Sequence, residues 1–434
     1  MTGRHPMQLG LQRSVILGHA PWGLGTNETI MPEYLRDLGY ATHAVGKWHL
    51  GFFAKELTPL YRGFDSYYGW AEAGYWGYDF RDGIDLDRSA NGSYSTELFA
   101  SRAERIIQNH DSSKPLFLYL PYQAVHSGIP SQPGYNPLEA PKKYTDRFPY
   151  ITDPNRKLFA GMVSALDDAI GNVTAALSAK GLLDNSVIIF STDNGGPANG
   201  FDMNHACNWP LRGLKATYWE GGMRATGFIW SPLLKKRGRV SNQMVHVTDW
   251  LPTIMHLAEL YGMNMWQTLS EDLPSPRDEI IHNYDKTTGA IRQGPYKVIV
   301  IGKEASYTKS YDKWYKPESI DVSKLNLTVK CGVRDPSLPA CTNDTSPCLF
   351  HVVDDPCEFN NIAQRHPQLV QKMVKRLLDV ASRSQAPRNC PTERWGAPVY
   401  HGHAWVPWIK IPPGVKDFRA CPPHMADLVD DLHI

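Results

Sequence analysis

The sequence predicts an α/β fold in which helices cover both faces of a mostly parallel sheet. Two apolar runs, "PLFLYL" (115–120) and "VIIFST" (187–192), flank a segment of helical periodicity at 156–180. Strands that are buried on both faces are continuously apolar, and a strand, helix, strand order is typical of parallel sheets. The apolar face predicted for this helix carries Leu158, Val163, Leu166, Ile170, Val173 and Leu177. A further helix is predicted at 249–259.

The character of the chain changes at about residue 286. The segments "PYKVIVIG" (295–302) and "LFHVVDD" (349–355) predict paired strands around a long cysteine-bearing loop, and 366–382 predicts an amphipathic helix. With 434 residues, the chain is long enough for two domains.

We therefore expect an α/β domain over 1–285 and a smaller subdomain over 286–434. The subdomain is predicted to combine a small antiparallel sheet, a helix and a cysteine-containing tail. The tail from 386 onward is rich in Pro, Trp and His, and its pattern predicts no particular element.

The composition is that of an ordinary globular protein. A hydrophobic content of 42% and a net charge of +1 argue against a nucleic-acid partner. No run approaches the roughly 20 apolar residues that a membrane span needs, so we expect no membrane span. The first residues, "MTGRHPMQLGLQRS", lack the apolar stretch of a signal peptide.

Cysteines and glycosylation sequons nevertheless predict the secretory pathway. Six of the seven cysteines lie in the last quarter, which favours disulfides. Their connectivity stays open, with Cys331–Cys341 and Cys348–Cys357 favoured by proximity; Cys207 is expected to be a plain thiol. The sequons, more than chance would give, are Asn27, Asn91, Asn172, Asn326 and Asn343. The absent signal peptide then hints at an incomplete N-terminus.

Asp193 and Asn194 follow the strand "VIIFST" directly. Ligands of parallel sheets bind beyond the carboxyl ends of the strands. A carboxylate and an amide carbonyl are hard oxygen donors of the kind that Ca²⁺ or Mg²⁺ accepts, and Gly195 and Gly196 allow a sharp turn beside an ion. An Asx-turn that merely closes the strand is the alternative.

Four basic side chains could join this site. In "GYATHAVGKWHLG" (39–51), Lys47 and His49 are two residues apart, so in an extended segment they project to the same side. His126 follows the strand 115–120, and Lys215 lies in a Gly- and Trp-rich loop. Each alone is more often structural, but two ammoniums and two imidazoles near strand ends suit a tetrahedral dianion.

At this point the chain resembles a known family. "GYATHAVGKWHLG", "PLFLYLPYQAVH", "AGMVSALDDAIGNVTAAL", "VIIFSTDNGG", "NWPLRGLKATYWEGGMR" and "DWLPTIMHLA" stand in the order and approximate spacing of the type I sulfatases. Within them, the chain is most similar to the arylsulfatase B (N-acetylgalactosamine-4-sulfatase) group. The resemblance covers residues 1–300 strongly and continues through "DDPCEFNNIA" (354–363).

The resemblance implies a fold, an activity and roles for these residues. The fold is an alkaline-phosphatase-like sandwich, and the activity is hydrolysis of sulfuric esters of sugars or aryl alcohols with one Ca²⁺ and a formylglycine made from Cys-x-Pro-Ser-Arg. Asp193 and Asn194 would be calcium ligands, and Lys47 and Lys215 would contact sulfate oxygens. His49 would partner the formylglycine hydroxyl, and His126 would act as a hydrogen-bond donor or acid toward the sulfate.

One departure from the family pattern affects the expected activity. None of the seven cysteines stands in Cys-x-Pro-Ser-Arg, and the family places that signature just before a Thr-Gly-Arg that matches residues 2–4 here. We therefore expect an N-terminally truncated chain with half a calcium site, weak or no calcium binding, and no turnover by the formylglycine route. The full-length protein would need a formylglycine-generating enzyme and would reside in lysosomes or be secreted.

Two alternatives remain open. The chain could be a non-catalytic pseudoenzyme that binds sulfated glycans through Lys47, Lys215 and the aromatic stretch "GYWGYDF" (74–80), although those aromatics could equally be core. A phosphatase or phosphodiesterase of the same superfold is disfavoured by the Lys-Trp-His and Arg-Gly-x-Lys segments.

Overall fold

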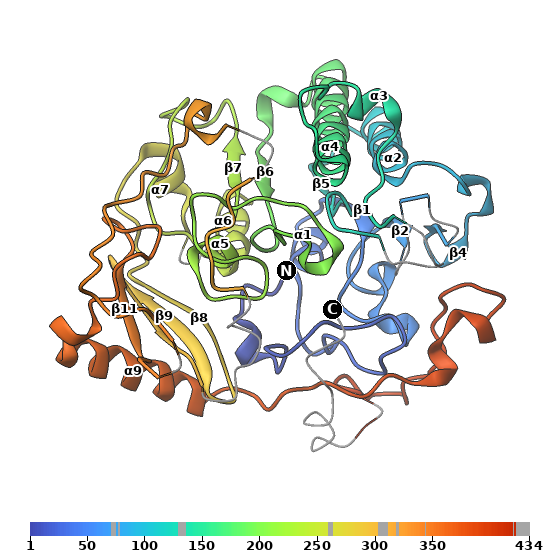
Figure 1. Cartoon of the computed structure of the whole chain (residues 1–434). Helices are drawn as coiled ribbons and strands as arrows, with labels where there is room; N and C mark the ends of the chain where they lie inside the picture. Colours follow the sequence, from blue (N-terminus) through green and yellow to red (C-terminus); the bar gives the residue numbers. More distant parts are fainter. Residues whose placement is uncertain are drawn as a thin grey trace.

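The structure is a computed structural model of the whole chain, seen in Figure 1. It describes residues 1–70, 75–76, 79–128, 136–258, 264–302, 311–317, 321–342, 344–419 and 421. The α-helices named below are α1 (Met31–Asp37), α2 (Ser95–Asn109), α3 (Lys142–Thr145), α4 (Pro154–Ala179), α5 (Glu220–Met223), α6 (Trp250–Leu257), α7 (Trp266–Glu271) and α9 (Pro367–Ser382).

A five-stranded sheet of order β4-β3-β2-β1-β5 forms the centre of the N-terminal part. Its parallel portion pairs β1 with β2 on one side and with β5 on the other, and β3 and β4 extend it as a short antiparallel edge. The strands are β1 (Ala41–Lys47), β2 (Ser66–Trp70), β3 (Arg81–Asp82), β4 (Asp85–Leu86) and β5 (Leu116–Tyr119). The predicted mostly parallel sheet is therefore confirmed.

Both faces of this sheet are covered, as successive residues of β1 illustrate. Ala44 packs with Ile30 and Phe64 on one face. Val45 packs with Tyr68 and Phe99 of α2 on the other. Side chains alternate across a strand, so a strand with both kinds of position buried must lie between two layers.

The strand β6 (Ile188–Ser191) departs from the expected arrangement. It pairs antiparallel with β7 (Gly227–Trp230) in a separate two-stranded sheet. Among the described residues, neither β6 nor β5 has a strand partner on its other edge. The order strand, helix, strand was predicted correctly, but the direct parallel neighbour of β5 is β1 and not β6.

The helix between these two strands is α4, and its buried face matches the predicted one only in part: Val173 is buried, and Leu158 and Leu177 pack against core clusters. Val163 is 44% exposed. The buried positions are Gly161, Met162, Ala165, Ala169, Val173 and Ala176. α2 packs along α4 and brings Ala103 and Ile107 against it. Small residues allow this close approach, whereas apolar periodicity gives most weight to large side chains.

A four-stranded antiparallel sheet of order β11-β10-β9-β8 forms the C-terminal part, with α9 along one face (Figure 1). Its strands are β8 (Glu279–Asp285), β9 (Thr288–Gln293), β10 (Tyr296–Val300) and β11 (Cys348–His351). Val298 and Leu349 of the sheet pack against Met373 and Leu377 of α9. The predicted paired strands and helix are confirmed. The division at residues 285 and 286 stays a prediction, and β8, on its N-terminal side, pairs with β9 across it.

The structure corrects the favoured disulfide pairing. The bonds join Cys331 to Cys357, Cys341 to Cys348 and Cys390 to Cys421, and Cys207 is a free thiol. The chain enters β11 at Cys348 and turns back after it, which brings Cys357 to Cys331 across the shorter 341–348 loop. Proximity along the chain could not reveal this nested arrangement.

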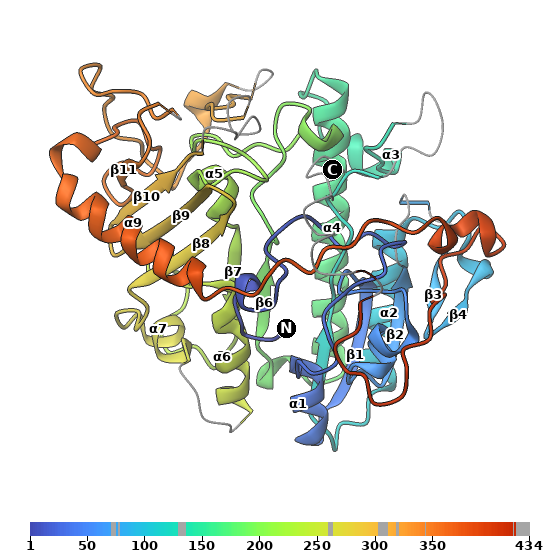
Figure 2. The same ribbon diagram turned by 90° about the horizontal axis from the view of Figure 1, so that it is seen from below.

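The segment after α9 returns to the N-terminal part. Seen from below, it passes from the antiparallel sheet to the side of β3 and β4 (Figure 2). Its backbone donates hydrogen bonds from Gln385 to Met7, from Arg388 to Gly10 and from Trp408 to Phe53. These contacts make the tail a return strap, defined as residues 383–409.

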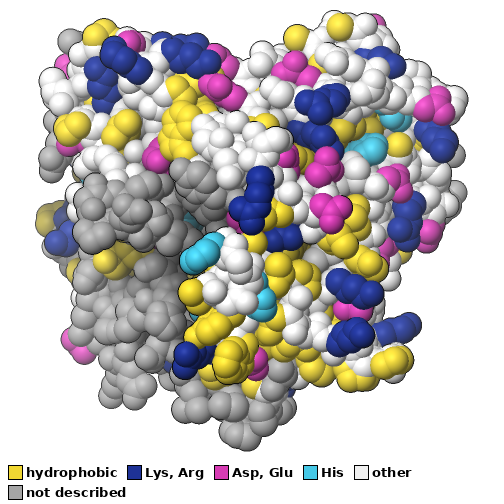
Figure 3. Space-filling model, turned by 90° about the vertical axis from the view of Figure 1, so that its right-hand side faces the viewer, with side chains coloured by type: hydrophobic (Ala, Val, Ile, Leu, Met, Phe, Trp, Pro, Cys, Tyr) yellow, Lys and Arg dark blue, Asp and Glu magenta, His cyan; other side chains and the backbone are white. Residues whose placement is uncertain are grey.

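The surface carries both signs of charge. On the face shown in Figure 3, Lys and Arg side chains alternate with Asp and Glu, and hydrophobic side chains gather in the lower half. This mixture fits the net charge of +1. In the part of the chain that the structure describes, none of the helices has the length and apolar character required to traverse a bilayer.

Candidate active site

The carboxyl end of β1 delivers Lys47 to the same edge of the sheet as the segment that follows β5. The backbone N–H of Lys47 donates to the carbonyl of Pro121 at 2.7 Å. Gly46 has φ +132°, and a Cβ there would lie 2.2 Å from the Pro121 carbonyl oxygen. Only glycine allows this approach, so the two strand ends are held together.

His126 lies in the loop beyond β5 with a defined orientation. Its Nδ1 is 2.7 Å from the carbonyl oxygen of Ser127. A carbonyl oxygen only accepts, so Nδ1 carries the proton and Nε2 is the acceptor in the neutral ring. The hydroxyl of Tyr75 donates to the His126 carbonyl at 2.8 Å and fixes the backbone.

Lys215 reaches His126 from the far side of the site. Its Nζ is 3.2 Å from His126 Nε2 and 2.7 Å from Asp202 Oδ2. Asp202 Oδ2 is also 3.4 Å from His126 Nε2. The Lys215 and Asp202 side chains are 14% and 7% exposed, so this ion pair lies largely out of solvent.

Asp202 is a site residue that sequence reasoning missed. It lies in the loop that follows Asn194, in a left-handed conformation with φ 52°. Ser127 Oγ donates to its carbonyl at 2.7 Å. It is the one carboxylate between Asn194 and Lys215, and this was the feature of the sequence that could have indicated Asp202 as a partner for Lys215. Its position near Lys215 depends on the path of the loop, which local pattern does not encode.

The environment of His49 is strongly unfavourable to a positive charge. Burial lowers the pKa of His49 to about 3, and Lys47, His126 and Lys215 lower it further than the bonded Ile16 carbonyl raises it. Within the described residues, His49 Nε2 is buried without a hydrogen-bond partner. His49 is therefore a neutral imidazole at physiological pH, with a ring nitrogen available to a ligand or proton.

The pKa of His126 is lowered as well. Burial is the main cause, followed by the charges of Lys215 and Lys47, while the Ser127 carbonyl and Asp202 act in the opposite direction. These mutual effects couple Lys47, His49, His126 and Lys215 in one electrostatic cluster, while the roles of the four residues stay predictions. Two ammoniums beside two neutral imidazoles favour an anion with several negative oxygens.

Asp193 and Asn194 follow β6 as predicted. Burial, and then the charge of Asp193, raises the pKa of Tyr119 at the end of β5, so the carboxylate lies near that strand end. Asn194 Nδ2 donates to the Gly195 carbonyl at 2.9 Å, which leaves its oxygen as the acceptor. A Cβ on Gly195 would lie 1.8 Å from the carbonyl oxygen of Gly221, so the turn is packed directly on α5.

These two residues fit the chemistry of Ca²⁺ only in part. A carboxylate and a carboxamide oxygen are suitable donors, but Ca²⁺ takes six to eight oxygens. Over the described ranges, His, Cys, Asp and Glu side chains form no group of three or more that could hold a metal. Asp193 and Asn194 alone do not complete a calcium site.

Other predicted residues have simpler environments. Asn27, Asn91, Asn172 and Asn326 are exposed, as attached glycans require, and Asn343 lies outside the described residues.

In the aromatic stretch, Tyr75 and Phe80 are 0% and 1% exposed and belong to the core, while Trp76 is 37% exposed. Stacking of sugars on Tyr75 or Phe80 is thus excluded, because their rings are already packed. Gly74, Gly77 and Tyr78 are not among the described residues.

The fold and this cluster define the class of protein. The family model described as Sulfatase matches residues 1–260. The chain belongs to the sulfatase family.

Individual relatives agree with this assignment. The chain is 37% identical over 455 residues to mouse arylsulfatase J, covering 94% of this chain and 71% of that protein. It is 26% identical over 422 residues to mouse N-acetylgalactosamine-6-sulfatase, covering 87% and 76% of the two chains. The narrower similarity to arylsulfatase B stays a prediction.

Solved structures share the fold. The crystal structure of Ps i-CgsB in complex with k-i-k-neocarrahexaose superposes with a TM-score of 0.70 at 23% identity, covering 91% of this chain and 83% of that one. The structure of BT4656 in complex with its substrate D-glucosamine-2-N,6-O-disulfate superposes with a TM-score of 0.55 at 16% identity, covering 88% of each chain. At these identities the similarity concerns the fold.

Proposed function

We propose that this chain is the body of a sulfuric ester hydrolase that removes sulfate from sulfated sugars. The observation that carries the proposal is the cluster in which Lys215 Nζ lies 3.2 Å from His126 Nε2, with Lys47 and His49 electrostatically coupled to both. The relative named N-acetylgalactosamine-6-sulfatase supports a sulfated amino sugar as the substrate class.

The proposed roles follow from charge and protonation. Lys47 and Lys215 bind sulfate oxygens through charge-assisted hydrogen bonds. His126 orients the ester through Nε2 and donates a proton when it is protonated. His49 stays neutral even at pH 5, because its pKa is about 3, so its unpartnered Nε2 accepts a hydrogen bond from an attacking hydroxyl and orients it. Asp202 balances Lys215 without ligand, so an incoming sulfate competes with this carboxylate.

Two groups from outside this chain complete the proposed chemistry. Formylglycine would supply the nucleophile, and its cysteine, modified by a formylglycine-generating enzyme, is not among the seven cysteines here. Ca²⁺ would take oxygen donors from Asp193 and Asn194 together with further ligands. Over the described ranges the outer edges of β5 and β6 pair with no other strand, so each edge can accept an additional strand. We propose that the chain alone binds sulfate esters without turning them over.

The cellular setting is proposed on chemical grounds. Three disulfides and four exposed sequons favour the secretory pathway, and delivery to lysosomes or secretion follows from it. The second candidate is a non-catalytic protein that binds sulfated glycans through the same two lysines.

Binding to the chain alone tests the anion site. Sulfate and N-acetylgalactosamine 4-sulfate would be titrated calorimetrically into the wild type and into Lys215→Met. We expect the substitution to weaken binding about 10-fold or more, because a charge-assisted hydrogen bond contributes roughly 1.5–3 kcal/mol. Lys372→Met removes an exposed lysine on α9 and is the matched control. Equal affinity of Lys215→Met and wild type would refute the proposed site.

Hydrolysis distinguishes the two candidate functions. The chain and the protein purified from its natural source would be incubated with 4-nitrophenyl sulfate at pH 5 and pH 7. Turnover by the natural protein with none by the chain supports the hydrolase. Binding without turnover in both supports the glycan-binding protein, and turnover by the chain alone would overturn the formylglycine requirement.

A further inference from the structure

We infer that a buried ion cluster in the C-terminal part positions Lys215 in the anion site. The cluster consists of Lys297, Glu220 and Glu358. Lys297 Nζ lies 2.9 Å from Glu220 Oε1 and 2.9 Å from Glu358 Oε1. The three side chains are 0%, 4% and 0% exposed. The role rests on the proposed function of Lys215.

The cluster joins three segments that are distant in sequence. Lys297 belongs to β10, Glu220 begins α5, and Glu358 lies in the turn after β11. Glu358 Oε2 also accepts the backbone N–H of Glu220 at 2.7 Å. Glu358 therefore holds Glu220 twice, directly through its backbone and indirectly through Lys297.

A second attachment fixes the other end of the Lys215 segment. The guanidinium of Arg212 donates to the Glu358 carbonyl at 3.3 Å, and its Cζ lies 3.6 Å from the ring centre of Trp219. Residues 212–220, which carry Lys215, are thus tied to Glu358 at both ends. A shift of Glu358 would be transmitted to Lys215.

The same anchor reaches the turn that carries Asp193 and Asn194. The backbone N–H of Gly195 donates to the Gly222 carbonyl at 2.9 Å, and the N–H of Lys215 donates to the Gly196 carbonyl at 3.4 Å. α5 is therefore a shared support for both halves of the site.

The charges of the cluster suit positioning better than stability. Two buried carboxylates and one buried ammonium incur a large desolvation cost, and apolar residues of similar size often stabilise a fold as well or better. A charged cluster instead fixes the relative position of the three segments, because its ammonium and two carboxylates meet in one geometry only. Burial, and then the charge of Glu220, raises the pKa of Glu358 to about 7, although Lys297 opposes the change.

The test uses the pKa of His126, measured in ligand-free protein, as a reporter of the position of its neighbour Lys215. The ring resonance of His126, assigned with His126→Gln, is titrated by NMR in the wild type and in the triple variant Lys297→Met/Glu220→Gln/Glu358→Gln, which removes all three charges of the cluster together. Because Lys215 lowers the pKa of His126, displacement of Lys215 should raise that pKa by half a unit or more. Lys215→Met gives the upper limit.

Hydrogen exchange provides a second readout. We expect amides of 212–222 to exchange at least 10-fold faster in the triple variant, while those of β1 and β5 are unchanged. If the triple variant does not fold, Glu358→Gln, which leaves Lys297 balanced by Glu220, is measured in the same way. A folded variant with the wild-type His126 pKa and wild-type exchange at 212–222 overturns the inference.

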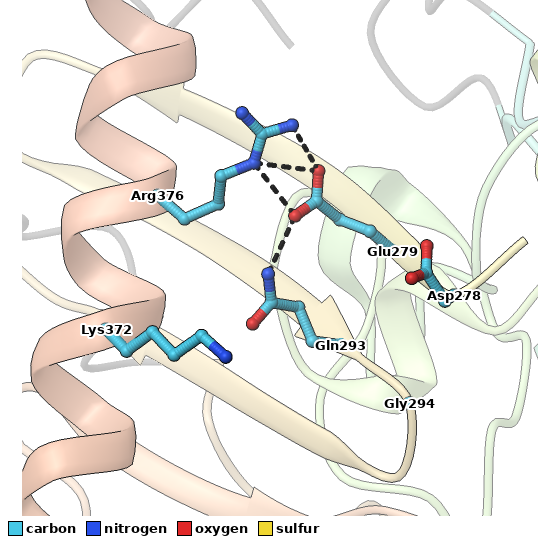
Figure 4. Close-up of a pocket in the computed structure, with 6 residues that line it drawn as sticks. All are labelled: Asp278, Glu279, Gln293, Gly294, Lys372 and Arg376. Atoms are coloured by element: carbon cyan, nitrogen blue, oxygen red, sulfur yellow. Dashed lines mark hydrogen bonds and ion pairs between the residues drawn. The ribbon is translucent and has the colours of Figure 1, made fainter.

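A surface ion pair of the same sheet supplies the matched control. Arg376 of α9 lies 2.8 Å from Glu279 of β8, and Gln293 donates to the same carboxylate in the pocket of Figure 4. The double variant Glu279→Gln/Arg376→Gln should leave His126 and the 212–222 amides unchanged. A change in this control would also overturn the inference. No measurement here uses sulfate, so failure of sulfate binding would count against the proposed function alone.

Discussion

The neutral state of His49 makes a quantitative prediction about stability and pH. The pKa of a histidine in the unfolded chain is about 6.5, and in the folded protein that of His49 is lowered to about 3. A group with a lowered folded pKa stabilises the fold fully above its unfolded pKa, and this stability is lost as the pH falls from 6.5 toward 3. Between pH 7.5 and pH 5, the contribution of His49 to the free energy of unfolding falls by about 2 kcal/mol, because 1.36 kcal/mol is lost per pH unit over the 1.5 units below 6.5.

His49→Gln removes this titration without adding a charge. Urea unfolding at pH 7.5, 6 and 5 should show that the wild type loses about 2 kcal/mol more than the variant between the extremes. The substitution also changes the packing and hence the absolute stability at pH 7.5, so the comparison concerns the pH slope. His49→Phe should give the slope of His49→Gln despite different packing. Parallel slopes for the wild type and both variants would refute the neutral, buried His49.

Further predictions concern other parts of the molecule. Leu377→Ala, at a fully buried position between α9 and the antiparallel sheet, should lower the free energy of unfolding by about 2–5 kcal/mol in urea titrations, whereas an effect below 1 kcal/mol would contradict the packing. Asp202→Asn should strengthen sulfate binding severalfold in calorimetry, because the carboxylate no longer competes for Lys215; weaker binding would show that Asp202 assists the ligand. Calcium titrated into the chain should bind weakly or not at all, and a micromolar Kd would reveal donors beyond Asp193 and Asn194.

The sequence predicted the elements that have strong local patterns and the meeting of residues at strand ends. Lys47 and His126 lie near one edge because the parallel strands β1 and β5 end there, a rule that holds without knowledge of the loops. Lys215 reaches His126 from the loop before α5, which this rule does not predict. The prediction that Val163 is buried is wrong, because alanines that fit against α2 define the buried face of α4. Periodicity of large apolar residues does not detect such a face.

The remaining features depend on contacts between distant segments. Asp202 reaches Lys215 through the path of a loop, and Cys357 reaches Cys331 across a folded strand. Lys297 left a signal in the sequence, since it interrupts the apolar run "PYKVIVIG". Its partners lie 77 residues before it and in another turn, so a single segment could not name them.

The return strap constrains how this protein can be made. Asn389 donates a hydrogen bond to the carbonyl of Arg13 across 376 residues, and Gln12 bonds to Gln385 across 373. During synthesis Gln12 and Arg13 emerge long before Gln385 and Asn389, so these hydrogen bonds form only after all the residues between them have left the ribosome. The N-terminal segment must therefore wait with its apolar residues exposed, and contacts of such high sequence separation form slowly. We expect nascent chains that stop before residue 385 to depend on chaperones, and completion of the strap to release them.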